Sequence, residues 1–509
     1  MNNNDNKNNL SIVEKTEKYG NQKINFYKTL TLIVILFVIL MPIRQKYLCL
    51  IEKSRLLTYY PAETQVYFDF ETNHLTSKIK ANKYMPDIAA KSEYFSFGFW
   101  KDPKSSYCNK LAVFKFKRKD QYFNLLHPKI NDDTQPRLYT ANLTFENYKH
   151  HKIFHLKNQN KLCTIDKEKL FITESPTVLK ELIDRIENGR KGLLERRNVR
   201  KALELIDKKR DGTIFILDNK FLLNKSISKK IPGIAKIVDF VDISAFSVNF
   251  EDNNIITKGK TLLNYKKIKD RAVINSFKDF NKEPSVLNEN CFIPEKSIMY
   301  ATVGNFKNIF NLFLTLNDIK QQPEYTQMLD FMKDSIGLNV ENDLLSKFNG
   351  CSSLVLVPEG KEIEAAGIFR TSKNPQPEIT KLINFFQTQN SVVNIVDSDL
   401  RGYSLKHLKT DKIPYSIYFG MVGNNNFVVG QQNVLNEVIK AIKENQTPKN
   451  TLPKTQIAIY LDSNAAKEII QRFKQRKIPV NGIDFIKAEF SIDDNVINSF
   501  IKIGGGDTT

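Results

Sequence analysis

Residues 170–186 read LFITESPTVLKELIDRI, and residues 427–442 read FVVGQQNVLNEVIKAI. Each stretch begins as a short apolar strand and continues as a helix whose apolar residues return after three or four positions, so that they share one face. The helical stripes are Val178, Leu179, Leu182, Ile183 and Ile186 in the first stretch and Val434, Leu435, Val438, Ile439 and Ile442 in the second. The shared phase predicts two copies of one strand and helix unit.

Other segments correspond in the same order around these two stretches. PAETQVY at 61–67 resembles PEKSIMY at 294–300, and the turn Glu251-Asp252-Asn253 corresponds to Asp493-Asp494-Asn495. Alternating apolar and polar residues separated by such turns are typical of hairpins, which build antiparallel sheets. We therefore expect an α+β fold, with two tandem copies of an antiparallel-sheet domain, helices packed on one face, and one N-terminal transmembrane helix before them.

The chain has 509 residues, too many for one compact core, and two domains of about 200 residues each fit this length. Copy two carries an insertion for which we expect helices over 325–336 and 340–348, the first ended by Gly337. The predicted organisation is a disordered polar N-terminus (1–25), a transmembrane signal anchor (26–48), copy one (56–263), a linker (264–289), copy two (290–503) and a tail (504–509).

The anchor is predicted from residues 29–43, TLTLIVILFVILMPI, which contain no charge and extend with their apolar flank to about 18 residues, the lower end for a membrane span. Arg44 and Lys46 follow in place of the small residues of a cleavage site, so we expect an uncleaved anchor. Basic residues are balanced on both sides of the span and do not fix its orientation. The short polar segment before it favours a cytoplasmic N-terminus, with the bulk of the chain outside the inner membrane.

Composition and charge narrow the class of protein. With 41% hydrophobic and 11% aromatic residues, the chain has the composition of a globular protein. Its net charge of +20 fits a polyanion or an anionic membrane surface as a partner. Lys, Asn and Ile also abound in the loops, as an AT-rich coding sequence would produce without any such partner.

Five cysteines form no CxxC pair and show no metal-ligand spacing, which argues against zinc and thioredoxin-like chemistry. Cys108 with Cys163, or Cys291 with Cys351, would pair within one copy. An oxidising compartment is allowed by this pattern and is not required by it.

The layout resembles a bacterial family of extracytoplasmic proteins, domain-of-unknown-function family 3352. The resemblance covers most of residues 56–503 and rests on three features: Tyr60-Pro61-Ala62-Glu63-Thr64 at the start, IGLNVENDLLSKFNG at 336–350, and the strand with its striped helix in each copy. It implies a membrane-anchored module without an assigned catalytic residue.

Chemistry-bearing patterns are few. His151 and His155 would share one face of a strand and are weak candidates for a metal site, although His150 would face the other way and no carboxylate or cysteine stands at ligand spacing. No GxSxG, GxxxxGK[ST] or GxGxxG motif occurs, so we predict no catalytic residue and no cofactor.

A basic segment lies between residues 190 and 210. Its cations, which would meet phosphates of nucleic acid, lipid or cell-wall polymer, are Arg190, Lys191, Arg196, Arg197, Arg200, Lys201, Lys208, Lys209 and Arg210. No aromatic side chain is interleaved, which disfavours nucleic acid. The competing interpretation is a solvated helix with Leu194, Val199, Leu203 and Ile206 turned inward.

These patterns lead to a membrane-anchored extracytoplasmic protein of the bacterial envelope that binds a protein or an envelope polymer as a scaffold or accessory factor, without catalysis. Two alternatives stay open. One is an enzyme with a noncanonical site between the two copies, and the other is a membrane-tethered polyanion binder that uses the basic segment.

Overall fold

The computed structural model describes residues 56–72, 92–101, 108–117, 143–156, 161–190, 192–207, 210–219, 232–251, 254–282, 291–360, 362–389, 393–410, 416–447, 452, 454–462 and 483–504. The predicted anchor, residues 26–48, lies outside these ranges, as does the polar segment 1–25. Within the described ranges, no helix is both long and apolar enough to cross a bilayer.

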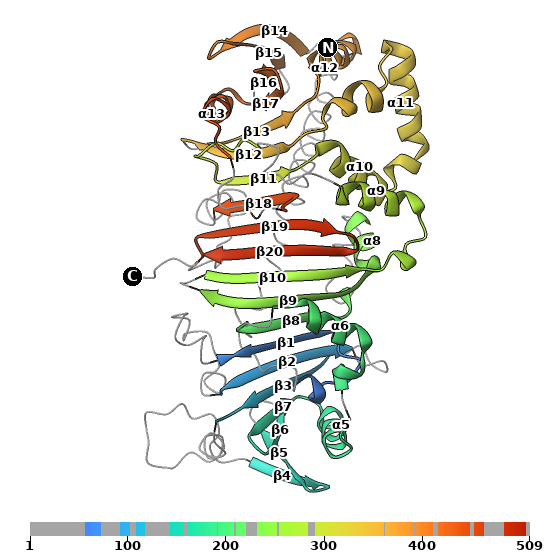
Figure 1. Ribbon diagram of the computed structural model, residues 1–509, viewed down its shortest axis with the longest axis vertical. Coiled ribbons are helices and arrows are strands. Elements are labelled where there is room, and N and C mark those ends of the chain that lie inside the picture. Colours follow the sequence, from blue (N-terminus) through green and yellow to red (C-terminus); the bar gives the residue numbers. More distant parts are fainter. Residues whose placement is uncertain are drawn as a thin grey trace, which may run out of the picture.

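Twenty strands of the described residues form one antiparallel sheet (Figure 1). In spatial order, its first half is β4 (Leu143–Tyr148), β5 (His151–Leu156), β6 (Lys161–Asp166), β7 (Lys169–Thr173), β3 (Cys108–Lys115), β2 (Tyr94–Lys101), β1 (Val66–Glu71), β8 (Gly212–Ile216), β9 (Val241–Glu251) and β10 (Asn254–Leu263).

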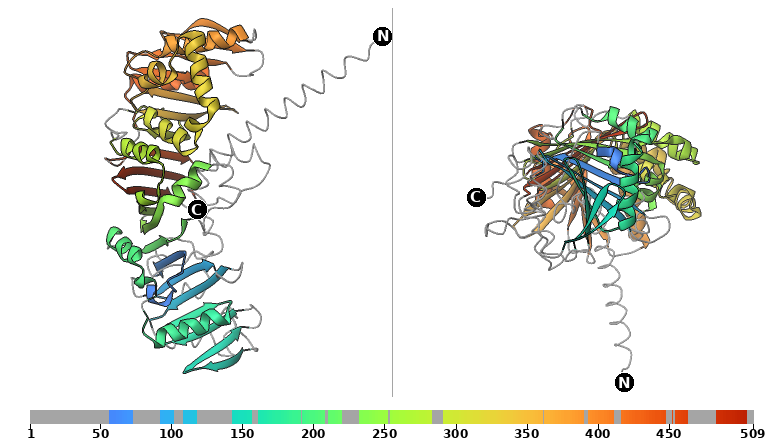
Figure 2. Two further views of the ribbon diagram at one scale, coloured as in Figure 1. Left: turned by 90° about the vertical axis from the view of Figure 1, so that its right-hand side faces the viewer. Right: turned by 90° about the horizontal axis from the view of Figure 1, so that it is seen from below.

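The second half starts at the opposite edge and shows the same pairing order. It is β14 (Val393–Leu400), β15 (Tyr403–Thr410), β16 (Ile417–Val422), β17 (Asn426–Gly430), β13 (Glu362–Arg370), β12 (Ser352–Glu359), β11 (Met299–Val303), β18 (Ile457–Asp462), β19 (Phe485–Asp493) and β20 (Val496–Gly504). Seen from below, the strands fan around the long axis, as the twist of a large sheet requires (Figure 2).

The pairing of β10 with β20 corrects the predicted fold class. We expected two tandem α+β domains preceded by a transmembrane helix, but residues 254–262 pair continuously with residues 496–504 and join both halves in one 20-stranded sheet. An edge strand exposes unpaired backbone N–H and C=O groups. Here the groups of β10 and β20, the inner edge of each half, form hydrogen bonds with each other. The structure therefore shows one continuous sheet in place of two separate domains.

Two helices on the sheet are those expected from the apolar stripes, α5 (Pro176–Glu187) and α13 (Gln432–Lys443). Four of the five stripe residues are buried in each helix, including Leu179 and Leu182 in α5 and Leu435 and Val438 in α13. Different groups cap them. Ser175 Oγ accepts a hydrogen bond from the Val178 N–H at the start of α5, and the buried carboxylate of Glu364 on β13 accepts one from the Val434 N–H of α13 at 2.9 Å.

The remaining helices of the described residues are α6 (Arg197–Leu205), which packs on β9, and α8 (Pro232–Phe240), α9 (Arg271–Asn281), α10 (Phe306–Leu316), α11 (Pro323–Ile336) and α12 (Gln376–Gln389). Short turns are η2 (Leu56–Tyr59), η4 (Gly192–Glu195), η6 (Tyr265–Lys267), η7 (Ile319–Gln321), η8 (Val340–Leu344) and η9 (Leu345–Lys347). Gly337 takes a φ of 63° and ends α11 as expected. The α-helix predicted over 340–348 is instead a π turn followed by a 3-10 turn.

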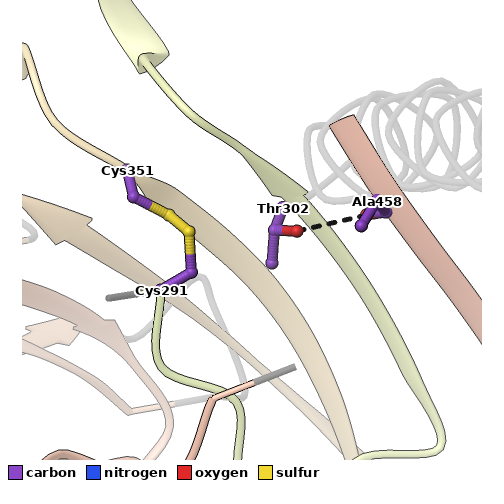
Figure 3. Close-up of a disulfide and its surroundings, with 4 residues drawn as sticks. All are labelled: Cys291, Thr302, Cys351 and Ala458. Carbon is purple, nitrogen blue, oxygen red and sulfur yellow. Dashed lines mark hydrogen bonds between the residues drawn. A yellow bond between two sulfur atoms is a disulfide. The ribbon is translucent and has the colours of Figure 1, made fainter. Parts of the chain in front are cut away.

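A disulfide joins Cys291 to Cys351 in the core of the second half (Figure 3). Both residues are buried, and their Cα atoms lie 5.6 Å apart, within the usual span of a disulfide. Beside it, the Thr302 hydroxyl donates a hydrogen bond to the Ala458 carbonyl across β11 and β18. Cys108 and Cys163 are free thiols, and burial raises the pKa of Cys163 to about 12.

Candidate functional site at the seam of β10 and β20

The pairing of β10 with β20, which we call the seam, lies near the middle of the stack of strands (Figure 1). Across β9, β10, β20 and β19, Ser247 pairs with Lys258, Lys258 with Phe500, and Phe500 with Glu489. Directly opposed residues of an antiparallel sheet point to the same face. These four side chains therefore form one row across the seam.

This row is part of the floor of a cavity of about 260 Å³. One wall consists of residues 205–207 at the end of α6, and the other of Leu452, Lys454 and Thr455, which precede β18. The cavity thus combines segments from both halves of the sheet, and Leu205, Ile206, Leu452 and Phe500 give it a largely apolar surface.

The most buried ionisable group of the cavity is Glu489, which is 1% exposed. Its Oε2 accepts hydrogen bonds from the Leu452 N–H at 2.9 Å and from the Thr455 hydroxyl at 3.0 Å. Its Oε1 lies 2.6 Å from Nζ of Lys487, which is two residues earlier on the same face of β19. The carboxylate therefore ties the segment before β18 to the floor, and Lys487 balances its charge.

Another buried carboxylate, Asp69, lies on β1 of the first half. Burial raises the pKa of Asp69 to about 7, although hydrogen bonds from Thr213 and Tyr67 and the nearby Arg210 guanidinium act in the opposite direction. The Tyr67 hydroxyl donates to Oδ2 of Asp69 at 2.8 Å. Asp69 is 2% exposed and does not line the seam cavity.

A larger groove of about 570 Å³ lies beside α11 and α12. Its lining is polar, and Lys347, its most enclosed cation, already donates to the Asn374 carbonyl at 2.9 Å and forms an ion pair with Glu378. A polar groove with internally paired charges is typical of solvated surface. The seam cavity, with an apolar wall and a buried carboxylate, is the better candidate for a binding site.

Comparison with known proteins identifies the family. A family model described as "Protein of unknown function (DUF3352)" matches residues 109–396. The chain belongs to this family. No curated protein matches it. Two solved structures of TP0453 show a likeness at 9% identity. Crystal form I is similar over 41% of this chain and 78% of its own, with a TM-score of 0.26. Crystal form III is similar over 44% of this chain and 86% of its own, with a TM-score of 0.27. The family resemblance expected from the sequence is thus confirmed.

In this DUF3352 protein, the predicted basic segment is divided between structural and exposed cations. Arg196 NH1 donates to the Ala62 carbonyl at 3.1 Å and to the Thr64 carbonyl at 3.2 Å, and Arg210 Nε donates to Thr213 Oγ1 at 2.8 Å. The exposed cations are Arg190 and, on α6, Arg197, Arg200 and Lys201, whereas Lys191, Lys208 and Lys209 lie outside the described residues. Val199 and Ile206 are buried, as the solvated-helix interpretation expects. Polyanion binding by this segment stays a prediction.

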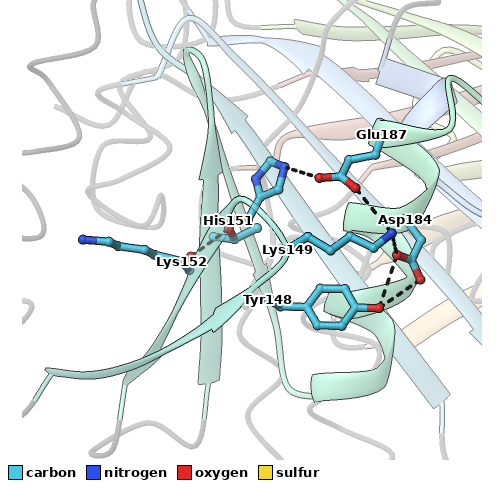
Figure 4. A network of polar contacts seen from close by, with 7 residues as sticks. Tyr148, Lys149, His151, Lys152, Asp184 and Glu187 are labelled. Carbon is cyan, nitrogen blue, oxygen red and sulfur yellow. Dashed lines mark hydrogen bonds and ion pairs between the residues drawn. The ribbon is translucent and has the colours of Figure 1, made fainter.

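The predicted metal candidates belong to the β4–β5 hairpin, which folds against α5 (Figure 4). His151 Nε2 lies 3.8 Å from Oε1 of Glu187, and Lys149 Nζ lies 3.3 Å from Oε2 of the same carboxylate. The Tyr148 hydroxyl donates to Asp184 at 3.2 Å. Among the described residues, no three His, Cys, Asp or Glu side chains are grouped as metal ligands. The contacts of His151 are those of a hairpin held on its helix, and His155 pairs across the ladder with Thr144.

Sequence reasoning did not single out Glu489 or Asp69. Each is an acid within a strand, FIKAEFSID at 485–493 and VYFDFE at 66–71, and each has an apolar residue directly before and after it. A charged residue in such a position is rarely buried without a partner, so it is a usable signal. The partners of Glu489 are Leu452 and Thr455 in another segment, which only the fold brings to it.

Proposed function

We propose that this DUF3352 protein is a membrane-tethered, extracytoplasmic binding protein that acts as a scaffold or accessory factor at the bacterial envelope. The observation that carries the compartment is the disulfide between Cys291 and Cys351, both almost fully buried. Disulfides form and persist in oxidising compartments, whereas cytosolic thiols are kept reduced. Cys163 is also buried, but its thiol is free. Burial alone therefore does not account for the bond between Cys291 and Cys351.

The tether in this proposal is the uncharged segment predicted at residues 26–48, with the N-terminus in the cytoplasm. A tether at the inner membrane would hold the body of the chain outside the cytoplasm. An oxidising compartment there would explain the structural disulfide.

Binding, in preference to catalysis, is supported by the charges of the seam cavity. Its two carboxylates, Asp207 and Glu489, each have a cationic partner, Lys258 at 3.2 Å and Lys487 at 2.6 Å. A general base needs a carboxylate that is free to take a proton from a substrate. Both carboxylates, one on the wall and one on the floor, are thus engaged in ion pairs, which leaves the apolar surface of the cavity to a ligand.

The compartment is tested on the full chain in its native membrane. Cells are lysed in a denaturant that contains a maleimide, so that buried thiols are reached, and the labelled cysteines are located by mass spectrometry with and without prior reduction. We expect Cys291 and Cys351 to react only after reduction, and a reporter fused after residue 509 to be active outside the cytoplasm. Labelling of both cysteines without reductant, together with a reporter active only in the cytoplasm, would overturn the proposal.

A further inference from the structure

We propose that the seam cavity binds a small anion with an apolar body, such as an aryl or short acyl carboxylate or phosphate ester. This inference rests on the binding function proposed above and names the class of ligand. The cavity of about 260 Å³ corresponds to roughly nine water volumes, which suits a ligand of about ten non-hydrogen atoms.

The apolar half of this recognition comes from both walls and the floor. Leu205 and Ile206 line the end of α6, and Phe500 lies in the floor row between Lys258 and Glu489. Leu452 stands on the opposite wall and is 44% exposed, so part of its side chain is open to a ligand. An apolar body in the cavity would remove these side chains from water.

The negative charge of the proposed ligand is inferred from the cavity lysines that have no carboxylate partner among the described residues. Lys258 is paired with Asp207, and Glu489 with Lys487. Lys260 on β10 and Lys454 on the wall before β18 also line the cavity, and among the described residues no carboxylate forms an ion pair with either. The cavity therefore holds an excess of positive charge beside an apolar surface, so it favours an anion over a cation or a neutral molecule.

The position of the two lysines links this site to the seam. Lys260 comes from the first half of the sheet and Lys454 from the second, on either side of the β10–β20 pairing. One anion that contacts both ammonium groups would bridge the two halves.

The test uses the full chain in lipid nanodiscs and four water-soluble probes measured by calorimetry. Phenyl phosphate carries both halves of the ligand, inorganic phosphate carries only the charge, and phenol carries only the ring; benzoate compares a carboxylate with a phosphate ester. We expect phenyl phosphate or benzoate to bind at least about tenfold more tightly than either half-ligand. Added salt should weaken binding of the anions and leave phenol unaffected.

Three variants make the test specific to the cavity. Lys260→Gln with Lys454→Gln should weaken phenyl phosphate about tenfold and leave phenol unchanged. Asn498→Phe, which places a ring in the cavity from β20, should abolish binding of every probe. Lys266→Gln, which removes an exposed lysine outside the cavity, is the matched control and should bind as the parent does.

Equal affinity for phenyl phosphate and its half-ligands would overturn the inference, as would full binding by the double lysine variant. Failure of every probe to bind would also overturn the inference. If the thiol labelling and the reporter still place the body outside the cytoplasm, such a failure refutes the ligand class and not the proposed compartment.

Discussion

Replacement of Asp69 by asparagine tests how the burial of a carboxyl group in the sheet affects stability. Asp69 is buried on β1 and accepts a hydrogen bond from the Tyr67 hydroxyl at 2.8 Å. Its pKa is raised by burial from 3.8 to about 7. Between these two pH values the folded protein holds a proton that the unfolded chain has lost, so the free energy of unfolding falls as the pH rises. The stability linked to Asp69 is fully present below about pH 4 and is lost as the pH rises through about 7.

The size of this effect follows from the two pKa values. A difference of about three pH units, at 1.36 kcal/mol per unit, corresponds to roughly 4 kcal/mol. Asparagine keeps an oxygen for Tyr67 and carries no titrating proton. The parent protein should therefore lose up to about 4 kcal/mol relative to Asp69→Asn between pH 4 and pH 7, with no further relative loss from this group above that range.

Trp100 provides the assay, because it is the one tryptophan of the chain and lies 5% exposed in the core of the first half. Urea unfolding followed by its fluorescence at several pH values gives the difference between parent and variant. Asp334→Asn, at an exposed position of α11, is the matched control and should follow the parent at every pH. A parent and an Asp69→Asn variant with parallel pH profiles would refute the reasoning.

Three further changes test other parts of the fold. Cys291→Ser with Cys351→Ser opens a 60-residue loop and should cost about 4 kcal/mol by loop-closure entropy, whereas Cys108→Ser should not lower the thermal midpoint; equal midpoints for all three proteins would contradict a disulfide. Lys487→Met leaves the Glu489 carboxylate buried without its cation and should lower the free energy of unfolding in urea by about 3 to 5 kcal/mol. Adding Glu489→Gln should restore most of this loss, whereas additive losses in the double variant would argue against the ion pair. Arg196→Gln loses hydrogen bonds to the Ala62 and Thr64 carbonyls and should lower the free energy of unfolding by about 2 kcal/mol. Arg197→Gln, at an exposed position, should change it by no more than about 0.5 kcal/mol, and equal losses in both variants would mean that Arg196 has no structural role.

The local elements were predictable because their residue patterns reflect burial directly. The stripes that contain Leu182 and Val438 specify helices that must bury one face, and they do so in α5 and α13. The Asp- and Asn-containing turns between the closing strands likewise predict hairpins, which form at β9–β10 and β19–β20.

The seam could not be predicted in the same way. NIITKGKTLL at 254–263 has a polar run between two apolar pairs, a pattern that does not distinguish an edge strand from an interior strand beside a cavity. The difference lies in backbone hydrogen bonds to β20, and these leave no mark in side-chain pattern. The seam cavity was missed for the same reason, since its residues come from α6, β10, β20 and the segment before β18 and meet only once the two halves pair.

Hydrogen exchange of the full chain in nanodiscs tests the continuous sheet most directly. Amides of β10 and β20 that donate across the seam should exchange as slowly as those of β1 and β8 inside the first half, and far more slowly than those of the outer strands β4 and β14. Exchange of β10 and β20 at the rate of the outer strands would contradict a sheet that runs unbroken through the molecule, and with it the cavity on which the proposed ligand depends.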